Sequence, residues 1–166
     1  MNLQFYLEKL KSSELFQDFM KENPEAFLCS GFFVIDKQAN NNQIHFDFYI
    51  SDKNKMFSFK LEGEIEKIPI ETITEIPEKI SDNCDFNFEQ VEKLIIKAMT
   101  EKNVNNKIQR ILLSLQKKKD KYFLVGSVFI SALGMIRIDI KIPEMKVVSF
   151  EKKSFFDMIK IIKKRD

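Results

Sequence analysis

The sequence predicts an α+β protein built from two similar units, each a helix followed by four antiparallel strands, with one more helix at the C-terminus. Two patterns support this prediction. Apolar residues recur at helical spacing in residues 91–99 and again after Ser154. Between such stretches, apolar and polar residues alternate with period two, which is typical of strands that bury one face and expose the other.

The N-terminal stretch predicts two short helices rather than one long helix. Leu3, Leu7 and Leu10 lie on one side of a helix, whereas the apolar residues that follow centre on nearly the opposite side. We therefore expect a break at Ser12–Ser13. The helix of the second unit is expected to follow Asn87, whose side chain can cap its N-terminus.

Strands are indicated most clearly in residues 44–50 and 136–142, where large apolar residues alternate with polar ones. Residues 51–55 have the composition of a hairpin turn after the first of these strands. Residues 122–130 are apolar on both faces, so we expect this strand to be covered twice, at the seam between the two units. Residues 108–116 fit either a helix or a strand, and strand is favoured.

The chain resembles itself at a spacing of about 80 residues, since FVIDKQANNNQ (33–43) can be aligned with LSLQKKKDKYF (113–123). Amphipathic strands also resemble one another by chance, so the repeat stays an open question. Pro69 favours an edge strand before a linker, because proline cannot donate a backbone hydrogen bond. The expected division is a first unit in 1–73, a linker in 74–86 and a second unit in 87–166, packed as one globule.

Phenylalanine dominates the aromatic residues, with 17 Phe against 3 Tyr and no Trp. A phenylalanine ring buries a large apolar area and needs no hydrogen-bond partner. The rings therefore fill a core or line a cavity for an apolar small molecule. The candidates for such a cavity are Phe46, Phe48, Phe57 and Phe59.

The cellular location is predicted from the N-terminus and the cysteines. Glu8 and Lys9 fall where the apolar core of a signal peptide would lie. The two cysteines, Cys29 and Cys84, form no CxxC pair and are expected to be buried thiols. We therefore predict a cytoplasmic protein. The apolar run 122–136 is shorter than the roughly 20 residues of a membrane-spanning helix, so no membrane span is predicted.

Few residues point to catalysis or cofactor binding. His45 is the one histidine, and its strand neighbour Asp47 shares its face. This pair could serve a hydrolase, although imidazole beside carboxylate on a strand is more often a surface contact. No spacing of ligands indicates a metal site, and no glycine-rich loop indicates a phosphate site. We predict no cofactor, no metal and no identified catalytic residue, and therefore a non-enzyme.

Charge is divided unevenly along the chain, with −6 in residues 1–83 and +8 in residues 84–166. Such asymmetry can steer a charged partner. The basic clusters KKKDK (117–121) and KKR (163–165) are short, and no aromatic residues are interleaved with them. We therefore predict a protein partner and no nucleic acid.

The hairpins YISDKNKMFSF (49–59) and IKIPEMKVVSF (140–150), each after a helix, resemble those of cystatin-like domains, and most nearly the PepSY type found in peptidase propeptides. The resemblance covers most of the chain and implies a binding module without chemistry of its own. The Thr-Gly that tends to end the family's turn is missing from both hairpins, so no functional residue is carried over.

Three hypotheses about function follow. The first is a non-enzymatic binding or regulatory protein that contacts another protein through its sheet surface. The second is a carrier or sensor of an apolar small molecule held by the four phenylalanines named above. The third, remote, is a hydrolase-type enzyme that uses His45. Partner identity and oligomeric state are not predicted.

Overall fold

The computed structural model of the chain describes residues 1–71 and 73–164. Its helices are α1 (Leu3–Lys11), α2 (Glu14–Glu22), α3 (Phe88–Glu101) and α4 (Phe155–Lys163). Its strands are β1 (Phe27–Asp36), β2 (Gln43–Ile50), β3 (Lys55–Lys60), β4 (Glu66–Ile70), β5 (Ile108–Lys118), β6 (Lys121–Ile130), β7 (Gly134–Ile142) and β8 (Lys146–Ser154).

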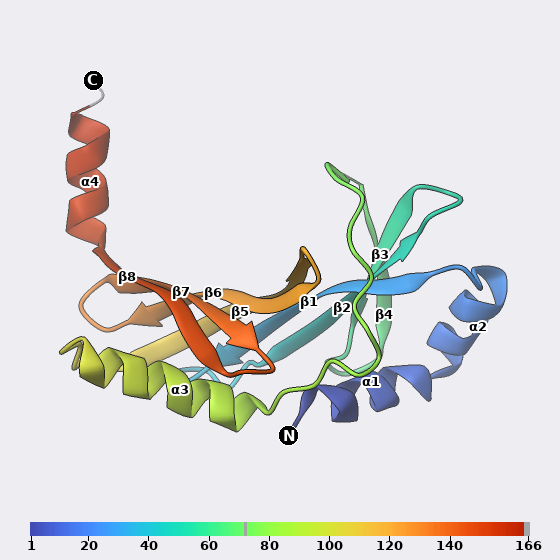
Figure 1. Cartoon of the computed structure of the whole chain (residues 1–166), viewed down its shortest axis with the longest axis horizontal. Coiled ribbons are helices and arrows are strands. Elements are labelled where there is room, and N and C mark those ends of the chain that lie inside the picture. The colour runs from blue at the N-terminus through green and yellow to red at the C-terminus, as the bar shows by residue number, and fades with distance from the viewer. Residues whose placement is uncertain (72, 165–166) are drawn as a thin grey trace.

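All eight strands form one antiparallel sheet in the order β4-β3-β2-β1-β5-β6-β7-β8 (Figure 1). The prediction of two helix-plus-sheet units is therefore wrong. Each half of the chain does fold its strands as a meander, but the two meanders share a single sheet. They are joined through β1 and β5, the first strand of each half.

The join between β1 and β5 explains why two separate units do not form. Their register runs from Gly31 opposite Leu115 to Asp36 opposite Arg110. A meander by itself would leave its first strand with a row of unpaired backbone N–H and C=O groups. Pairing the two exposed edges satisfies these groups and makes the sheet continuous. The pairing uses backbone groups, so it requires no particular side chain.

Two predictions about individual strands meet different outcomes. Residues 108–116 form part of β5, so the preference for strand over helix is confirmed. Residues 122–130 form most of β6, which pairs with β5 and β7 inside the second meander. The prediction that this strand is the seam is wrong, because the halves meet at β1 and β5.

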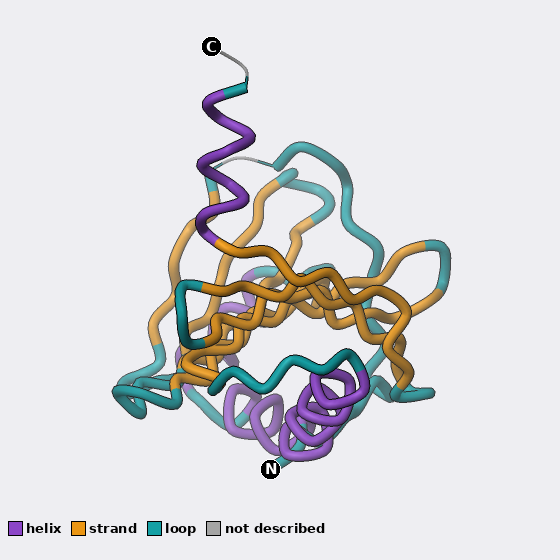
Figure 2. Tube along the Cα trace, turned by 90° about the vertical axis from the view of Figure 1, so that its left-hand side faces the viewer, coloured by secondary structure: helices purple, strands orange, loops and turns teal. Residues whose placement is uncertain are grey.

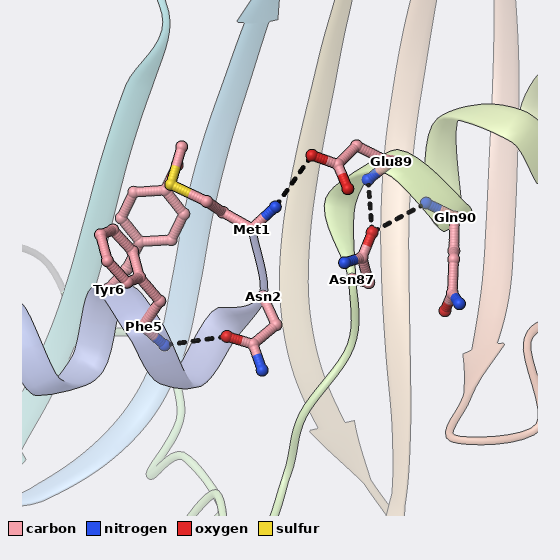
Figure 3. A network of polar contacts seen from close by, with 7 residues as sticks. All are labelled: Met1, Asn2, Phe5, Tyr6, Asn87, Glu89 and Gln90. Atoms are coloured by element: carbon pink, nitrogen blue, oxygen red, sulfur yellow. Dashed lines mark hydrogen bonds and ion pairs between the residues drawn. The ribbon is translucent and has the colours of Figure 1, made fainter.

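The predicted helix boundaries are confirmed. Helix α1 ends before Ser12, and the Ser13 side chain accepts from Phe16 N to begin α2, so the change of apolar face coincides with a new helix. The Asn87 side chain caps α3 by accepting from the backbone N–H groups of Glu89 and Gln90 (Figure 3). Side-chain capping satisfies N–H groups that have no partner within the helix.

The starts of α1 and α3 are tied together (Figure 3). Asn2 and Asn87, the two N-cap residues, form an isolated antiparallel bridge. The Met1 ammonium lies 2.9 Å from Glu89 Oε1, and it holds the pKa of that carboxyl below its ordinary value by a hydrogen bond and by its charge. Asp85 accepts from the Asn2 side chain at 2.8 Å. These contacts place both helices on the same side of the sheet.

The hydrophobic core lies between the sheet and helices α1, α2 and α3, which Figure 2 shows gathered on one side of the strands. Alternate residues of the strands point into it, and the helices contribute their apolar stripes. Among the described residues, the largest side chains with less than 2% exposure are Phe19, Phe33, Phe46, Phe59, Leu3, Leu7, Leu10, Ile50, Ile80, Ile95, Ile111 and Leu113.

An ion pair lies at the end of the β1–β5 pairing, where Asp36 is opposite Arg110. Arg110 Nη2 lies 2.8 Å from Asp36 Oδ2, and the Asp36 side chain is only 2% exposed. Asp36 also accepts from the backbone N–H groups of Gln38 and Ala39. These two N–H groups and then the Arg110 guanidinium lower the pKa of the Asp36 carboxyl.

The predicted linker 74–86 contacts both halves of the sheet. Ile80 is fully buried, and its N–H donates to Leu28 O at 2.8 Å. Ser81 N donates to the Tyr122 hydroxyl at the start of β6. The preceding edge strand is β4, and it contains Pro69 as expected. The segment therefore forms hydrogen bonds with a strand of each meander, β1 in the first and β6 in the second.

Neighbouring leucines in β5 offer a test of which face is the core. Leu113 is fully buried, whereas Leu112 lies on the opposite face and is partly exposed. We expect Leu113→Ala to lower the free energy of unfolding by about 2–5 kcal/mol, and Leu112→Ala by about 1 kcal/mol or less. Urea denaturation measures both. Equal losses would contradict the assignment of the two faces.

The Asp36 ion pair predicts a pH-dependent stability. Because the pKa of Asp36 is lowered in the folded state, its stabilising effect is present above the unfolded-state pKa of about 3.9 and is lost as the pH falls through the folded-state value. We expect Asp36→Asn to unfold at lower urea than the parent at neutral pH, with the gap narrowing in acid. A gap independent of pH would exclude this role.

Candidate functional site

Among the residues that the structure describes, no helix packs on one face of the sheet, and we call this face the open face. Because side chains alternate, residues next to core residues in the strands belong to it: Phe32 precedes the buried Phe33, and Leu112 precedes the buried Leu113. Figure 2 shows α1, α2 and α3 on the other side of the strands. The open face crosses both meanders.

Two rows of cross-strand neighbours run over the open face. The first row is Lys60, His45, Phe32, Ser114, Val125, Asp139 and Ser149. The second row is Gln43, Val34, Leu112, Ser127, Arg137 and Glu151. Since neighbours in a row lie within about 5 Å of one another, side chains from distant parts of the chain form one surface.

A hollow of about 440 Å³ lies where these rows pass over β5 to β8. Short side chains make it: Ser114, Ser127 and Ser149 line it, while Phe32 stands at its rim. Gly126 also lines it, and a Cβ at this position would lie 2.4 Å from Leu112 O and 2.7 Å from Leu113 Cδ2, so the close packing of β5 and β6 leaves no room for a larger residue. The hollow has the size of a small-ligand site or of a pocket for one or two anchoring side chains.

Charged groups of both signs line the hollow. Arg137 lies opposite Glu151 on the neighbouring strand, and Asp139 lies opposite Ser149. Lys153 Nζ is 3.7 Å from Glu151 Oε1. A guanidinium and two carboxylates beside apolar side chains can recognise a surface that carries both charges and an apolar anchor.

His45 and Asp47 both lie on the open face of β2, as predicted, but each has its own neighbour. The His45 ring is 6.2 Å from the Phe32 ring in an edge-to-face arrangement. Asp47 accepts from the Ser30 hydroxyl at 2.5 Å. This serine donates to the carboxylate rather than to the imidazole, so it is not activated as a nucleophile by His45. The arrangement favours cross-strand surface contacts over hydrolysis.

The four predicted cavity residues lie on the helix side of the sheet. Phe46, Phe48 and Phe59 are buried in the core, and Phe57 is half-buried against it. Their rings pack edge-to-face with those of α2: Phe16 is 4.9 Å from Phe48, and Phe19 is 5.7 Å from Phe57. This packing favours the core role. Binding of an apolar molecule by these residues stays a prediction.

Both cysteines are buried thiols. Burial, and then the charge of Asp47, raises the pKa of Cys29 to about 12. Burial, and then the charge of Asp85, raises the pKa of Cys84 to about 11. Only the thiolate is nucleophilic, so neither cysteine is activated. Within residues 1–71 and 73–164 no group of three or more His, Cys, Asp and Glu side chains could hold a metal ion.

The sequence does not single out the residues of the hollow. Arg137 and Asp139 are visible in it only as polar residues of the strand predicted at 136–142. The signal that could have found the site is Gly126–Ser127, two small residues inside an otherwise apolar strand. Its partners Ser114 and Ser149 become visible only with the strand register.

Comparison with known proteins gives one informative likeness. No family model and no curated protein matches the chain. A solved structure of a candidate lipoprotein from Clostridium difficile 630 is similar, with a TM-score of 0.56 and 15% identity over 84% of this chain and 91% of that one. At this identity the likeness establishes the fold alone, and it gives no support for a cystatin-like or PepSY relationship.

This likeness bears on the predicted location. Lipoproteins are anchored to membranes outside the cytoplasm, so the prediction of a cytoplasmic protein is contradicted and is withdrawn. Within the described residues, no helix is both long and apolar enough to cross a bilayer.

Thiol reactivity tests the account of the cysteines. With both pKa values raised, we expect a disulfide reagent at about pH 8 to modify native Cys29 and Cys84 slowly, and to modify the denatured chain at once. Absorbance of the released thiol follows both reactions. Rapid modification of the native protein would contradict their burial.

Proposed function

We propose that this chain is a non-enzymatic binding protein that contacts another protein through the open face of its sheet, with the hollow at the centre of the contact. The observation that carries the proposal is the hollow itself, where apolar, small and charged side chains from five strands meet on a face without helices. Surfaces of this mixed composition are typical of non-obligate protein interfaces.

Aromatic residues on the open face support a protein partner. Phe32 and Phe129 are each more than a third exposed, although they lie in the interior of strands. Phe32, in β1, belongs to the first row, and Phe129, in β6, lies two residues beyond Ser127 of the second row. Exposed aromatic side chains beside an arginine are the residues that most often dominate binding energy in an interface.

The charge of the two halves supports a partner that is itself charged. The first half carries −6 and the second half +8, and the hollow belongs mainly to the second half. An acidic partner surface would therefore be attracted at long range, while the Arg137, Asp139 and Glu151 groups would fix its register. This attraction weakens as salt is added.

A pair of tyrosine substitutions tests the proposal. Ser127→Tyr fills the hollow with a ring that a strand tolerates, and Thr100→Tyr is the control on the exposed side of α3. We expect native affinity capture to enrich a stoichiometric partner with the parent and with Thr100→Tyr. We expect Ser127→Tyr to weaken that partner at least about tenfold, or 1.4 kcal/mol.

Two outcomes would contradict the proposal. One is a partner retained equally by Ser127→Tyr, which would place the contact elsewhere. The other is failure of the parent chain to enrich any protein across several salt concentrations. Thermal unfolding of both variants checks that they remain folded.

A further inference from the structure

Helix α4 projects from the end of β8, away from the sheet and from the other three helices (Figure 1). It is well formed at its start, because Ser154 and Asp157 make a reciprocal capping box. Phe155 N donates a backbone hydrogen bond of 2.9 Å to the carbonyl oxygen of Leu133, which lies in the turn between β6 and β7. This hydrogen bond anchors the helix at its N-terminal end.

Large apolar side chains on α4 are left uncovered. Phe155, Phe156 and Ile162 are 51%, 62% and 64% exposed. Leu133, whose carbonyl accepts from Phe155, is also 64% exposed. The rings of Phe155 and Phe156 lie 6.5 Å apart. Apolar residues gathered at one tip of a protein indicate a surface that is covered by something else.

Lysines surround this apolar tip. Residues 152–164 contain five lysines and one acid, which leaves a net charge of +4. Lys152 and Lys153 precede the helix, Lys160 and Lys163 lie within it, and Lys164 follows it. The one acid, Asp157, is occupied by the Ser154 hydroxyl at 2.7 Å. The covering surface is therefore expected to be apolar and negatively charged.

We infer that α4 and Leu133 bind the surface of an anionic lipid bilayer. A helix that exposes phenylalanine and isoleucine together with lysine lies in the headgroup region, with its apolar side chains reaching the acyl chains and its lysines at the headgroups. Its nine residues are too few to cross a bilayer, which takes roughly 20. Each lysine adds about a factor of five in binding to an anionic surface.

Charge favours a lipid surface over a second copy of the chain. Packing two α4 helices against each other would bring two clusters of five lysines together, and like charges at short range repel. An anionic bilayer instead attracts the lysines and accepts the apolar side chains in the same contact. The hollow on the open face is a separate surface, so this inference does not depend on the proposed function.

Vesicle flotation of the chain tests the inference. We expect the parent to float with vesicles that contain phosphatidylglycerol and not with vesicles of phosphatidylcholine alone, and to be released by added salt. Phe155→Ser with Phe156→Ser should abolish flotation. Phe5→Ser is the control, because Phe5 is a 50% exposed phenylalanine on α1. Lys163→Gln with Lys164→Gln should weaken binding about 25-fold.

Three outcomes would overturn the inference. Absence of flotation by the parent is the first. Equal binding by the double serine variant, or equal loss with Phe5→Ser, is the second. The third is a dimer in sedimentation velocity that Phe155→Ser with Phe156→Ser dissociates, because α4 would then cover a second copy. Circular dichroism of every variant verifies that the sheet is intact.

Discussion

Backbone hydrogen bonding between β1 and β5 is the interaction on which the rest of the structure depends. It converts two four-stranded meanders into one sheet and removes two of the four edges that separate meanders would expose. The remaining edges are β4, which contains Pro69, and β8, which carries Lys146, Lys152 and Lys153. Proline and lysine both discourage further strand pairing, so the sheet ends at eight strands.

The bridge between the starts of α1 and α3 decides which face of the sheet is covered. Because the helix starts are bridged at Asn2 and Asn87, α1 and α3 begin side by side and cannot take opposite faces of the sheet. Both bury their apolar stripes on the same side, together with α2. The other face then has no element left to cover it. Phe32 and Phe129 therefore stay partly exposed on that face, because the topology places the helices on the other side.

Local features of the chain could be predicted, and long-range pairing could not. The capping residues Ser13, Asn87 and Ser154 each lie beside the helix they start, so their effect is visible in a short window of sequence. The β1–β5 join depends on backbone groups that every residue possesses, so no side chain marks it. The prediction of a cytoplasmic location is wrong for a different reason, since it rests on the lack of a signal peptide and on two cysteines that form no CxxC pair.

The hollow could not be found from the sequence because it depends on the register of strands that are distant in the chain, and its Phe32 side depends on the β1–β5 join. Phe32 comes from β1 in the first half, whereas Ser114, Ser127 and Arg137 come from the second half. The residues of the second half are neighbours within their own meander. Phe32 joins them only when the two meanders are held in the register that sets Phe32 opposite Ser114. The hydrogen bonds that hold the sheet together therefore also assemble its candidate binding site, and a change that shifts the β1–β5 register would disturb both.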